Sequence, residues 1–197
     1  MESKELIEKA VYDILVAIGE DPKRDGLLKT PHRVAKAWLE DLVSGYRIEP
    51  ASLLQTTFEE GDCEKTDNNI TVGSIEFVSL CEHHMLPFHG LVHIGYLPSE
   101  GIVGLSKFER LVDAFAHRLQ VQEKMTSQIA NTIMEVLKPK GCGVVVEAVH
   151  TCMSFRGVRK QNSITVTNAM RGLYKDDKST LKQEFLWSIQ NNRMRTV

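Results

Sequence analysis

The sequence has few of the features that mark membrane, secreted or nucleic-acid-binding proteins. No apolar run approaches the roughly 18 residues that a membrane-spanning helix needs, and the charged N-terminal segment MESKELIEKA lacks the apolar core of a signal peptide. The formal net charge is only −2 at pH 7, which gives no global sign of a nucleic-acid partner, so any anion site must be local. We therefore expect a soluble cytoplasmic protein that binds neither membranes nor nucleic acid.

Cysteine is also scarce: the chain has four, Cys63, Cys81, Cys142 and Cys152. Without an export signal, a disulfide framework is the weaker interpretation of these residues, and metal ligation or simple burial is favoured. Cys63 lies in an acidic stretch and Cys142 lies beside glycines, and neither is assigned a role.

The 197 residues, of which 42% are hydrophobic and 25% charged, suffice for one hydrophobic core with a small appendage. Apolar residues at three- and four-residue spacing predict a helix over 4–18, and Thr30-Pro31 predicts the start of a second helix that continues to residue 45. A polar, acidic stretch follows. We therefore divide the chain into an N-terminal helical appendage (1–47), a connecting loop (48–69) and a catalytic domain (70–197).

Within the third segment, strand and helix patterns follow each other in a definite order. Strand-like runs at 70–80, 91–96, 143–152 and 163–167 flank two helical patterns at 106–119 and 125–137, and a closing helix follows at 181–189. Ser106 and Glu109 have the spacing of a capping box. The first two strands should pair as a long antiparallel ribbon. This order predicts an α+β fold with an antiparallel sheet.

Two short segments carry residues typical of a metal site. Cys81 and His84 have the C-x-x-H spacing that lets one turn present a thiolate and an imidazole to a single zinc ion. If the strand at 143–152 continues to its end, His150 and Cys152 lie on one face of it. Cys81, His84 and Cys152 would then leave one coordination position open, which is the pattern of a catalytic zinc.

Two further imidazoles, those of His83 and His150, lie beside this set in sequence and suit proton transfer near pH 7. Other interpretations remain open from spacing alone. The thiols could be buried core residues, or His83 or His150 could complete a closed structural zinc site. Zinc binding of some kind is the safer prediction.

Residues for an anion or a base are less distinct. Lys107 and Arg110 lie at the start of a predicted helix, whose N-terminus favours anions, and Arg156 follows Cys152. Each could equally be a solvated surface residue. Glu123, with Gln122 beside it, could hold the edge of a guanine or could complement the dipole of its helix.

Several longer motifs, in order and in register, give the sequence a family resemblance. It resembles the GTP cyclohydrolase I family over nearly its whole length, with the shorter N-terminus of bacterial members. The matching motifs are TPHRVA at 30–35, CEHH at 81–84, PFHG at 87–90, HIGYLP at 93–98, GLSK at 104–107, RLQVQE at 118–123, HTC at 150–152 and FRGV at 155–158.

This resemblance implies the tunnelling fold, in which a four-stranded antiparallel sheet backed by two helices assembles into a barrel. It implies a homodecamer of two pentamers with active sites at subunit interfaces. It also implies zinc-dependent hydrolysis of GTP: the imidazole ring opens, formate is released, and the ribose rearranges to give 7,8-dihydroneopterin triphosphate, the first step of pterin and folate biosynthesis.

The resemblance further implies a role for each matching residue. In this interpretation His150 protonates N7 of the purine, and His83 and Ser106 are candidates for the sugar proton transfers. The remaining residues would be zinc ligands (Cys81, His84, Cys152), guanine ligands (Glu123, Gln122) and triphosphate ligands (Lys107, Arg110, Arg156, Arg33).

Two alternatives compete with this hypothesis. A relative on the same fold, such as a deazaguanine nitrile reductase or a pyruvoyl-tetrahydropterin synthase, would act on another purine or pterin, but such relatives lack the combination of CEHH with HTC. A non-catalytic zinc-stabilised nucleotide-binding or scaffolding protein would need neither His83 nor His150. The presence of both imidazoles disfavours it.

Overall fold

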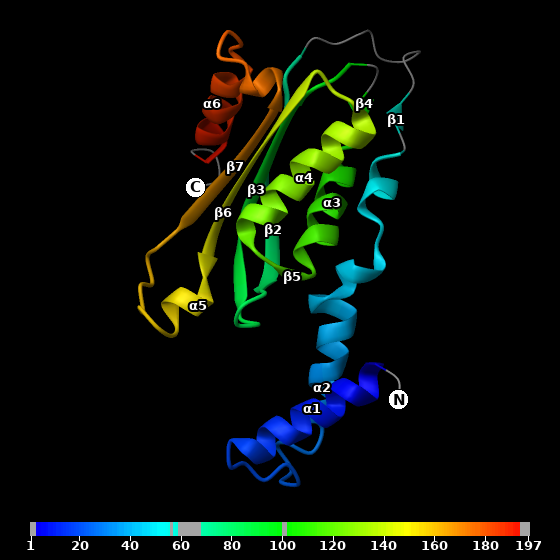
Figure 1. Cartoon of the computed structure of the whole chain (residues 1–197), viewed down its shortest axis with the longest axis vertical. Helices are drawn as coiled ribbons and strands as arrows, with labels where there is room; N and C mark the ends of the chain where they lie inside the picture. The colour runs from blue at the N-terminus through cyan, green and yellow to red at the C-terminus, as the bar shows by residue number, and fades with distance from the viewer. Residues whose placement is uncertain (1–2, 56, 59–67, 100–101, 194–197) are drawn as a thin grey trace.

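The protein is an α+β structure built around one twisted sheet (Figure 1). The computed structural model describes residues 3–55, 57–58, 68–99 and 102–193. The strand order is β5-β2-β3-β6-β7. The strands are β2 (Ile70–Cys81), β3 (Pro87–Leu97), β5 (Leu119–Gln120), β6 (Gly141–His150) and β7 (Thr165–Gly172). The predicted α+β class is therefore confirmed, and the tunnelling fold stays a prediction.

The predicted antiparallel ribbon is formed by β2 and β3. Their register runs from Ile70 opposite Tyr96 to Leu80 opposite Pro87, with an irregularity after Val72. At this bulge Ser74 has a φ of 59°. The β3 strand is longer than the predicted 91–96. Its first four residues, PFHG, include a proline and a glycine, which are depleted in strands, so the prediction missed them.

The strand count differs from the predicted four. Four strands pair antiparallel, and the fifth, β5, pairs in parallel with the end of β2. A second, two-stranded sheet joins β1 (Thr57–Phe58) to β4 (Ile102–Val103). Two-residue strands are too short to produce a periodic signal, so neither could be predicted from the sequence.

Two helices, α3 (Ser106–Ala116) and α4 (Gln122–Leu137), cover one face of the sheet (Figure 1). The core between them is apolar and fully buried, and includes Phe108, Leu111, Ile129, Ile133, Val92, Ile94 and Val144. The predicted capping box is wrong. The residue before α3 is Leu105, and no side chain of the described residues caps this helix end.

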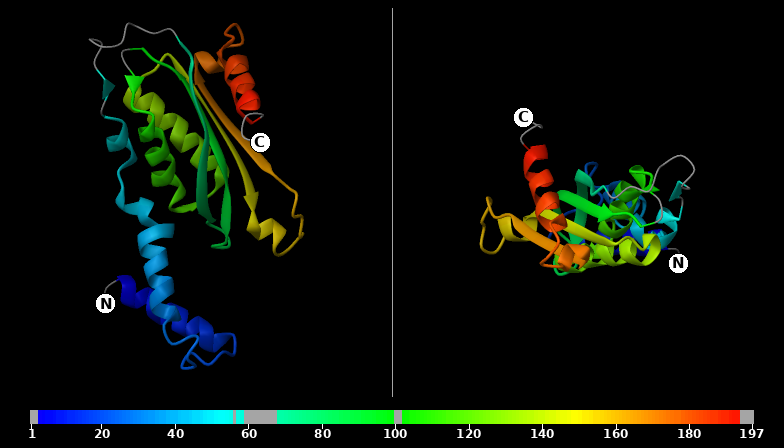
Figure 2. Two further views of the ribbon diagram at one scale, coloured as in Figure 1. Left: turned by 180° about the vertical axis from the view of Figure 1, so that it is seen from behind. Right: turned by 90° about the horizontal axis from the view of Figure 1, so that it is seen from above.

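A third helix, α6 (Leu181–Arg193), lies on the opposite face of the sheet, as Figure 2 shows. Its buried Phe185 packs directly on the sheet at two glycines, Gly95 and Gly143. A Cβ at Gly95 would lie 2.6 Å from the Phe185 ring. The close approach of this helix therefore requires glycine there.

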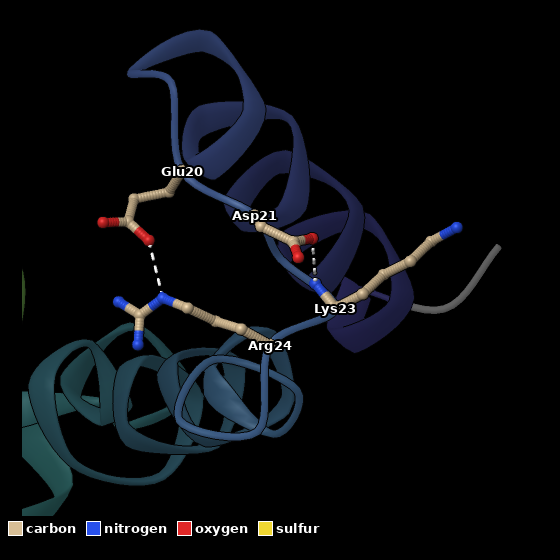
Figure 3. A network of polar contacts seen from close by, with 4 residues as sticks. All are labelled: Glu20, Asp21, Lys23 and Arg24. Atoms are coloured by element: carbon tan, nitrogen blue, oxygen red, sulfur yellow. Dashed lines mark hydrogen bonds and ion pairs between the residues drawn. The ribbon is translucent and has the colours of Figure 1, made fainter.

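The N-terminal helices α1 (Ser3–Ala17) and α2 (Thr30–Ala37) pack on each other and project from one end of the sheet (Figure 1). Figure 3 shows the polar contacts in the connection between them, where Arg24 Nε donates to Glu20 (2.8 Å) and Lys23 N donates to Asp21 (2.9 Å). The second predicted helix does not run unbroken to residue 45. After α2 the chain forms a π-helical turn, η1 (Trp38–Leu42), and a 3-10 turn, η2 (Ser44–Arg47).

The predicted connecting loop, 48–69, contains some regular structure. A 3-10 turn, η3 (Pro50–Leu54), inserts Leu54 into the core with no exposed surface. Residues 59–67, including Cys63 and most of the acidic stretch, lie outside the described residues. The division of the chain at 47 and 70 stays a prediction. Within the described ranges, no helix is both long and apolar enough to cross a membrane.

Candidate active site and metal centre

The Cys81–His84 turn connects β2 to β3 at one end of the sheet. Backbone N–H groups of His84 (3.3 Å) and Met85 (2.8 Å) donate to Cys81 O, and Cys81 N donates to Leu86 O (2.9 Å). These bonds close a tight turn in which Met85 takes a φ of 53°. The turn brings His84 Nδ1 to 3.8 Å from Cys81 Sγ.

The third predicted ligand reaches this turn from β6, by a different route from the one expected. The strand ends at His150, and a helical turn, α5 (Thr151–Ser154), carries Cys152. The prediction that the strand continues through Cys152 is therefore wrong. The turn is fixed by Thr151, whose hydroxyl donates to Pro87 O (2.5 Å) at the start of β3. Cys152 follows directly after this anchor.

Cys81, His84 and Cys152 converge, with one ligand atom of each lying within 4.8 Å of the other two. Donors bound to a single tetrahedral zinc at about 2.0–2.3 Å lie roughly 3.3–3.8 Å apart, so a small adjustment would complete such a site. Burial and the neighbouring Cys81 raise the pKa of the Cys152 thiol, whereas Arg156 lowers it. Two thiols and an imidazole form a donor set that suits zinc.

His150, at the end of β6, lies beside these ligands with its ring held on two sides. The ring stacks on Phe88, with centroids 4.6 Å apart and an angle of 4° between the planes. Its Nε2 lies 2.8 Å from Oε1 of Gln122. Burial lowers the pKa of His150, and the charge of Glu123 raises it.

The neighbours of Gln122 determine the orientation of its amide. Gln122 is 1% exposed, and its Nε2 lies 3.1 Å from each of three acceptors, Val146 O, Thr165 O and Thr167 Oγ1. The amide nitrogen must face these oxygens, so Oε1 faces His150 as an acceptor. The neutral His150 ring therefore carries its proton on Nε2 and leaves Nδ1 with a lone pair.

A pocket of about 240 Å³ opens beside these groups. Glu123, in the first turn of α4, places an exposed carboxylate at the wall of this pocket. His83, on the turn between β2 and β3, also lines it. The pocket thus brings together the three predicted ligand residues, two further imidazoles and a carboxylate. Its lining residues are Cys81, His83, His84, Gln120, Val121, Gln122, Glu123, His150, Cys152, Met153 and Thr165.

The family model for GTP cyclohydrolase I matches residues 7–190 of this sequence. The chain belongs to the GTP cyclohydrolase I family. Enzymes of this family convert GTP to dihydroneopterin triphosphate in folate and pterin biosynthesis and use a metal, and this chain is an enzyme of that reaction.

Curated relatives support the same assignment over almost the full length. GTP cyclohydrolase 1 of Wolinella succinogenes is 53% identical over 192 residues, which cover 97% of this chain and 100% of the relative. The corresponding proteins of Deinococcus radiodurans and Chlorobaculum tepidum are 48% and 50% identical, each over 93% of this chain and over 83% and 80% of their own lengths. A solved structure, the archaeosine synthase QueF-Like in the apo form, aligns with a TM-score of 0.46 at 15% identity, covering 55% of this chain and 97% of that one. That likeness is too weak to bear on function.

Not all residues implied by the resemblance to GTP cyclohydrolase I meet at this pocket. Ser106, Lys107 and Arg110 lie at the start of α3, beside β4 and away from the end of the sheet that carries the site (Figure 1). Arg33 lies on α2, and neither it nor Arg156 lines the pocket. The roles of all five residues stay predictions.

The structure adds residues that the sequence did not single out as part of a GTP cyclohydrolase I site. Phe88 stacks on His150, and Thr165 and Thr167 hold the amide of Gln122. Phe88 lies in a quoted motif, but its contact depends on the β3–β6 register, in which it lies opposite His150. Local spacing carries no information on that register.

Proposed function

We propose that this chain opens the imidazole ring of GTP at the pocket beside Cys81, His84 and Cys152. One observation carries this proposal: three convergent metal ligands, an oriented imidazole at His150 and an exposed carboxylate at Glu123 line the same pocket. Ring hydrolysis of a purine needs an activated water, an acid and a base-recognition group, and these residue types supply all three.

Cys81, His84 and Cys152 are the residues that would hold zinc. When bound by three protein ligands with a fourth position open, zinc supplies Lewis acidity that lowers the pKa of water to about 7 and so makes it a nucleophile at neutral pH. The hydrolysed atom is C8 of the purine, which must therefore lie beside these three residues.

Glu123 is the residue that would recognise guanine. A carboxylate can accept from both N1–H and the 2-amino group of guanine, which adenine and hypoxanthine do not both offer. Glu123 lies in the first turn of α4, where a negatively charged side chain complements the helix dipole. Guanine held there would present its imidazole ring towards His150 across the pocket.

His150 would transfer a proton at Nδ1, since its Nε2 is committed to Gln122. A protonated Nδ1 donates to N7 of the purine, which makes C8 electrophilic, and burial makes His150 a stronger acid. In this scheme Gln122 acts on the substrate through His150, because its own amide is enclosed by β6 and β7. His83 and Ser106 remain the candidates for proton transfers on the ribose.

We propose that binding of the triphosphate needs residues from a second copy of the chain. The pocket of about 240 Å³ is smaller than the roughly 300–1,000 Å³ of typical ligand sites, and no lysine or arginine is among the described residues that line it. We propose that the start of α3 in a neighbouring copy brings Ser106, Lys107 and Arg110 to the pocket, and that Arg156 and Arg33 add charge at its rim. A homodecamer of two pentamers, closed through β7 at one edge of the sheet and through β2, beyond the end that pairs with β5, at the other, would satisfy this need.

A cytoplasmic location is part of the same proposal, because Cys81 and Cys152 must stay reduced to bind a metal. The decisive experiment incubates the pure protein with GTP and measures formate together with the pterin fluorescence that appears after oxidation. We expect stoichiometric formate and pterin. Release of neither product by protein that contains its metal would contradict the proposed function.

A further inference from the structure

The short strand β5 lies between two parts of the candidate site, the Cys81–His84 turn and the start of α4. On one side it pairs with the end of β2, where Gln120 lies opposite Cys81 and its carbonyl accepts from Glu82 N (3.0 Å). On the other side it leads within two residues to Gln122, the first residue of α4. A displacement of β5 therefore moves both the metal-ligand turn and the residue that orients His150.

Arg118, the residue directly before β5, is held on four sides. Its Nε donates to Ala114 O (2.8 Å) in the last turn of α3, and its Nη2 donates to Ile48 O (3.1 Å). The guanidinium carbon lies 5.3 Å from the ring centre of Phe115 and 5.8 Å from that of Tyr46. These contacts fix the direction in which the chain leaves α3.

The backbone of the same segment is anchored as well. Arg118 O accepts from the hydroxyl of Ser79 on β2 (3.4 Å), and Leu119 N donates to the hydroxyl oxygen of Tyr46 (3.2 Å). Tyr46 belongs to η2, at the end of the N-terminal appendage. A strand of two residues has few ladder hydrogen bonds. These lateral contacts therefore help to hold it in place, together with the bonds that Gln120 Nε2 donates to Phe115 O (2.9 Å) and Gln128 Oε1 (3.0 Å).

The geometry points to Arg118, supported by Tyr46, as a positioning residue that sets the place of β5 and thereby aligns Gln122 with the Cys81 turn. Arg118 does not line the pocket and acts only through these neighbours. The inference rests on the proposed roles of Gln122 and Cys81. A misplacement of about 1 Å at a distance from the chemistry can cost on the order of a hundredfold in rate, so even a small shift of β5 is measurable.

Three variants separate positioning from general stability. Arg118→Lys keeps the positive charge but loses the planar fork and the stacking on both rings. Tyr46→Phe removes only the hydroxyl that accepts from Leu119. Arg47→Lys is the matched control. Arg47 follows Tyr46 directly in the sequence, but its side chain donates to Leu39 O (2.6 Å), inside the appendage.

We expect Arg118→Lys to lower kcat for GTP about tenfold and Tyr46→Phe to lower it about threefold, with Arg47→Lys close to the parent. The visible absorption bands of the cobalt-substituted protein report the geometry of the metal ligands without any turnover. They should shift in Arg118→Lys and Tyr46→Phe and stay unchanged in the control. Melting temperatures measured on the same samples give the change in stability.

The inference is wrong if Arg118→Lys lowers the melting temperature but leaves kcat, KM and the cobalt bands as in the parent. If Arg118→Lys does not fold, Tyr46→Phe decides by the same readouts, and parent-like values for it overturn the inference. A parent protein that binds cobalt but releases no formate from GTP would instead contradict the proposed function. In that case a shift of the cobalt bands in the two variants would still support the positioning role.

Discussion

The amide oxygen of Gln122 lies 2.8 Å from Nε2 of His150, and the amide nitrogen of the same side chain lies 3.1 Å from three oxygens of β6 and β7. The sheet therefore orients the glutamine, and the glutamine orients the histidine. His150 keeps Nδ1 available for the substrate as a result.

Gln122→Met should keep the metal but lower kcat about tenfold or more. The methionine fills a similar volume but offers His150 no acceptor, so the ring loses its orientation. Steady-state kinetics with GTP and zinc analysis measure the two quantities. Gln190→Met, at an exposed position on α6, is the control. An unchanged kcat would show that the orientation of His150 does not depend on Gln122.

His150→Ala should leave zinc content and oligomeric state intact and slow opening of the imidazole ring about a hundredfold or more, the usual effect of losing a positioned acid or base. Formate release in single-turnover experiments measures this step. The control is His32→Ala, an exposed imidazole on α2 that contacts Glu8. Formate release near the parent rate would remove His150 from the mechanism.

Cys152→Ser should abolish tight zinc binding, because the hydroxyl of serine is a much poorer ligand than a thiolate. Elemental analysis should give about one zinc per chain for the parent and far less for the variant. Cys142→Ala is the matched control, since Cys142 is buried between β6 and α4 and donates to Ala130 O (3.5 Å). Equal zinc content in parent and Cys152→Ser would exclude Cys152 as a ligand.

Glu123→Gln should lower kcat/KM for GTP on the order of a thousandfold, with little change in zinc content. The amide would place a donor against a donor of guanine and lose a charge-assisted bond. ITP, which lacks the 2-amino group, should be a poor substrate of the parent for the same reason. The control is Glu135→Gln on the exposed side of the same helix. Turnover of GTP by Glu123→Gln within a few-fold of the parent would favour the plain helix-dipole interpretation of Glu123.

The thiol of Cys142 should resist alkylation in the folded protein at pH 8. Burial raises its pKa from 9.0 to about 12, so only about one molecule in ten thousand carries the reactive thiolate. Below pH 9 the thiol is protonated in both the folded and the unfolded state. Between pH 9 and 12 only the unfolded chain releases the proton, so a rise in pH over this range lowers the free energy of unfolding. Mass spectrometry of iodoacetamide-treated peptides, with urea-unfolded protein as the control, checks this. Rapid labelling of the folded protein at this peptide would contradict the burial of Cys142.

Prediction from the sequence was most successful where the signal was local. The antiparallel ribbon, the two helices over the sheet and the C-x-x-H turn each follow from spacing within about a dozen residues. Cys152 was placed near Cys81 through an incorrect strand extension. The switch to the helical turn α5 depends on the bond from Thr151 to Pro87, which are 64 positions apart. The capping box failed because α3 begins one residue too early for Ser106 to cap it.

The sequence by itself determined the family, the α+β class and the identity of the three residues that converge in a group able to hold a metal, because motifs and periodicity are properties of neighbouring positions. Only the tertiary structure decided how these residues meet. The β3–β6 register stacks Phe88 on His150, the β6–β7 pair fixes the amide of Gln122, and β5 joins the ligand turn to α4. Each of these contacts links segments far apart in the chain, and their positions are set by strand pairing and core packing that no local pattern encodes.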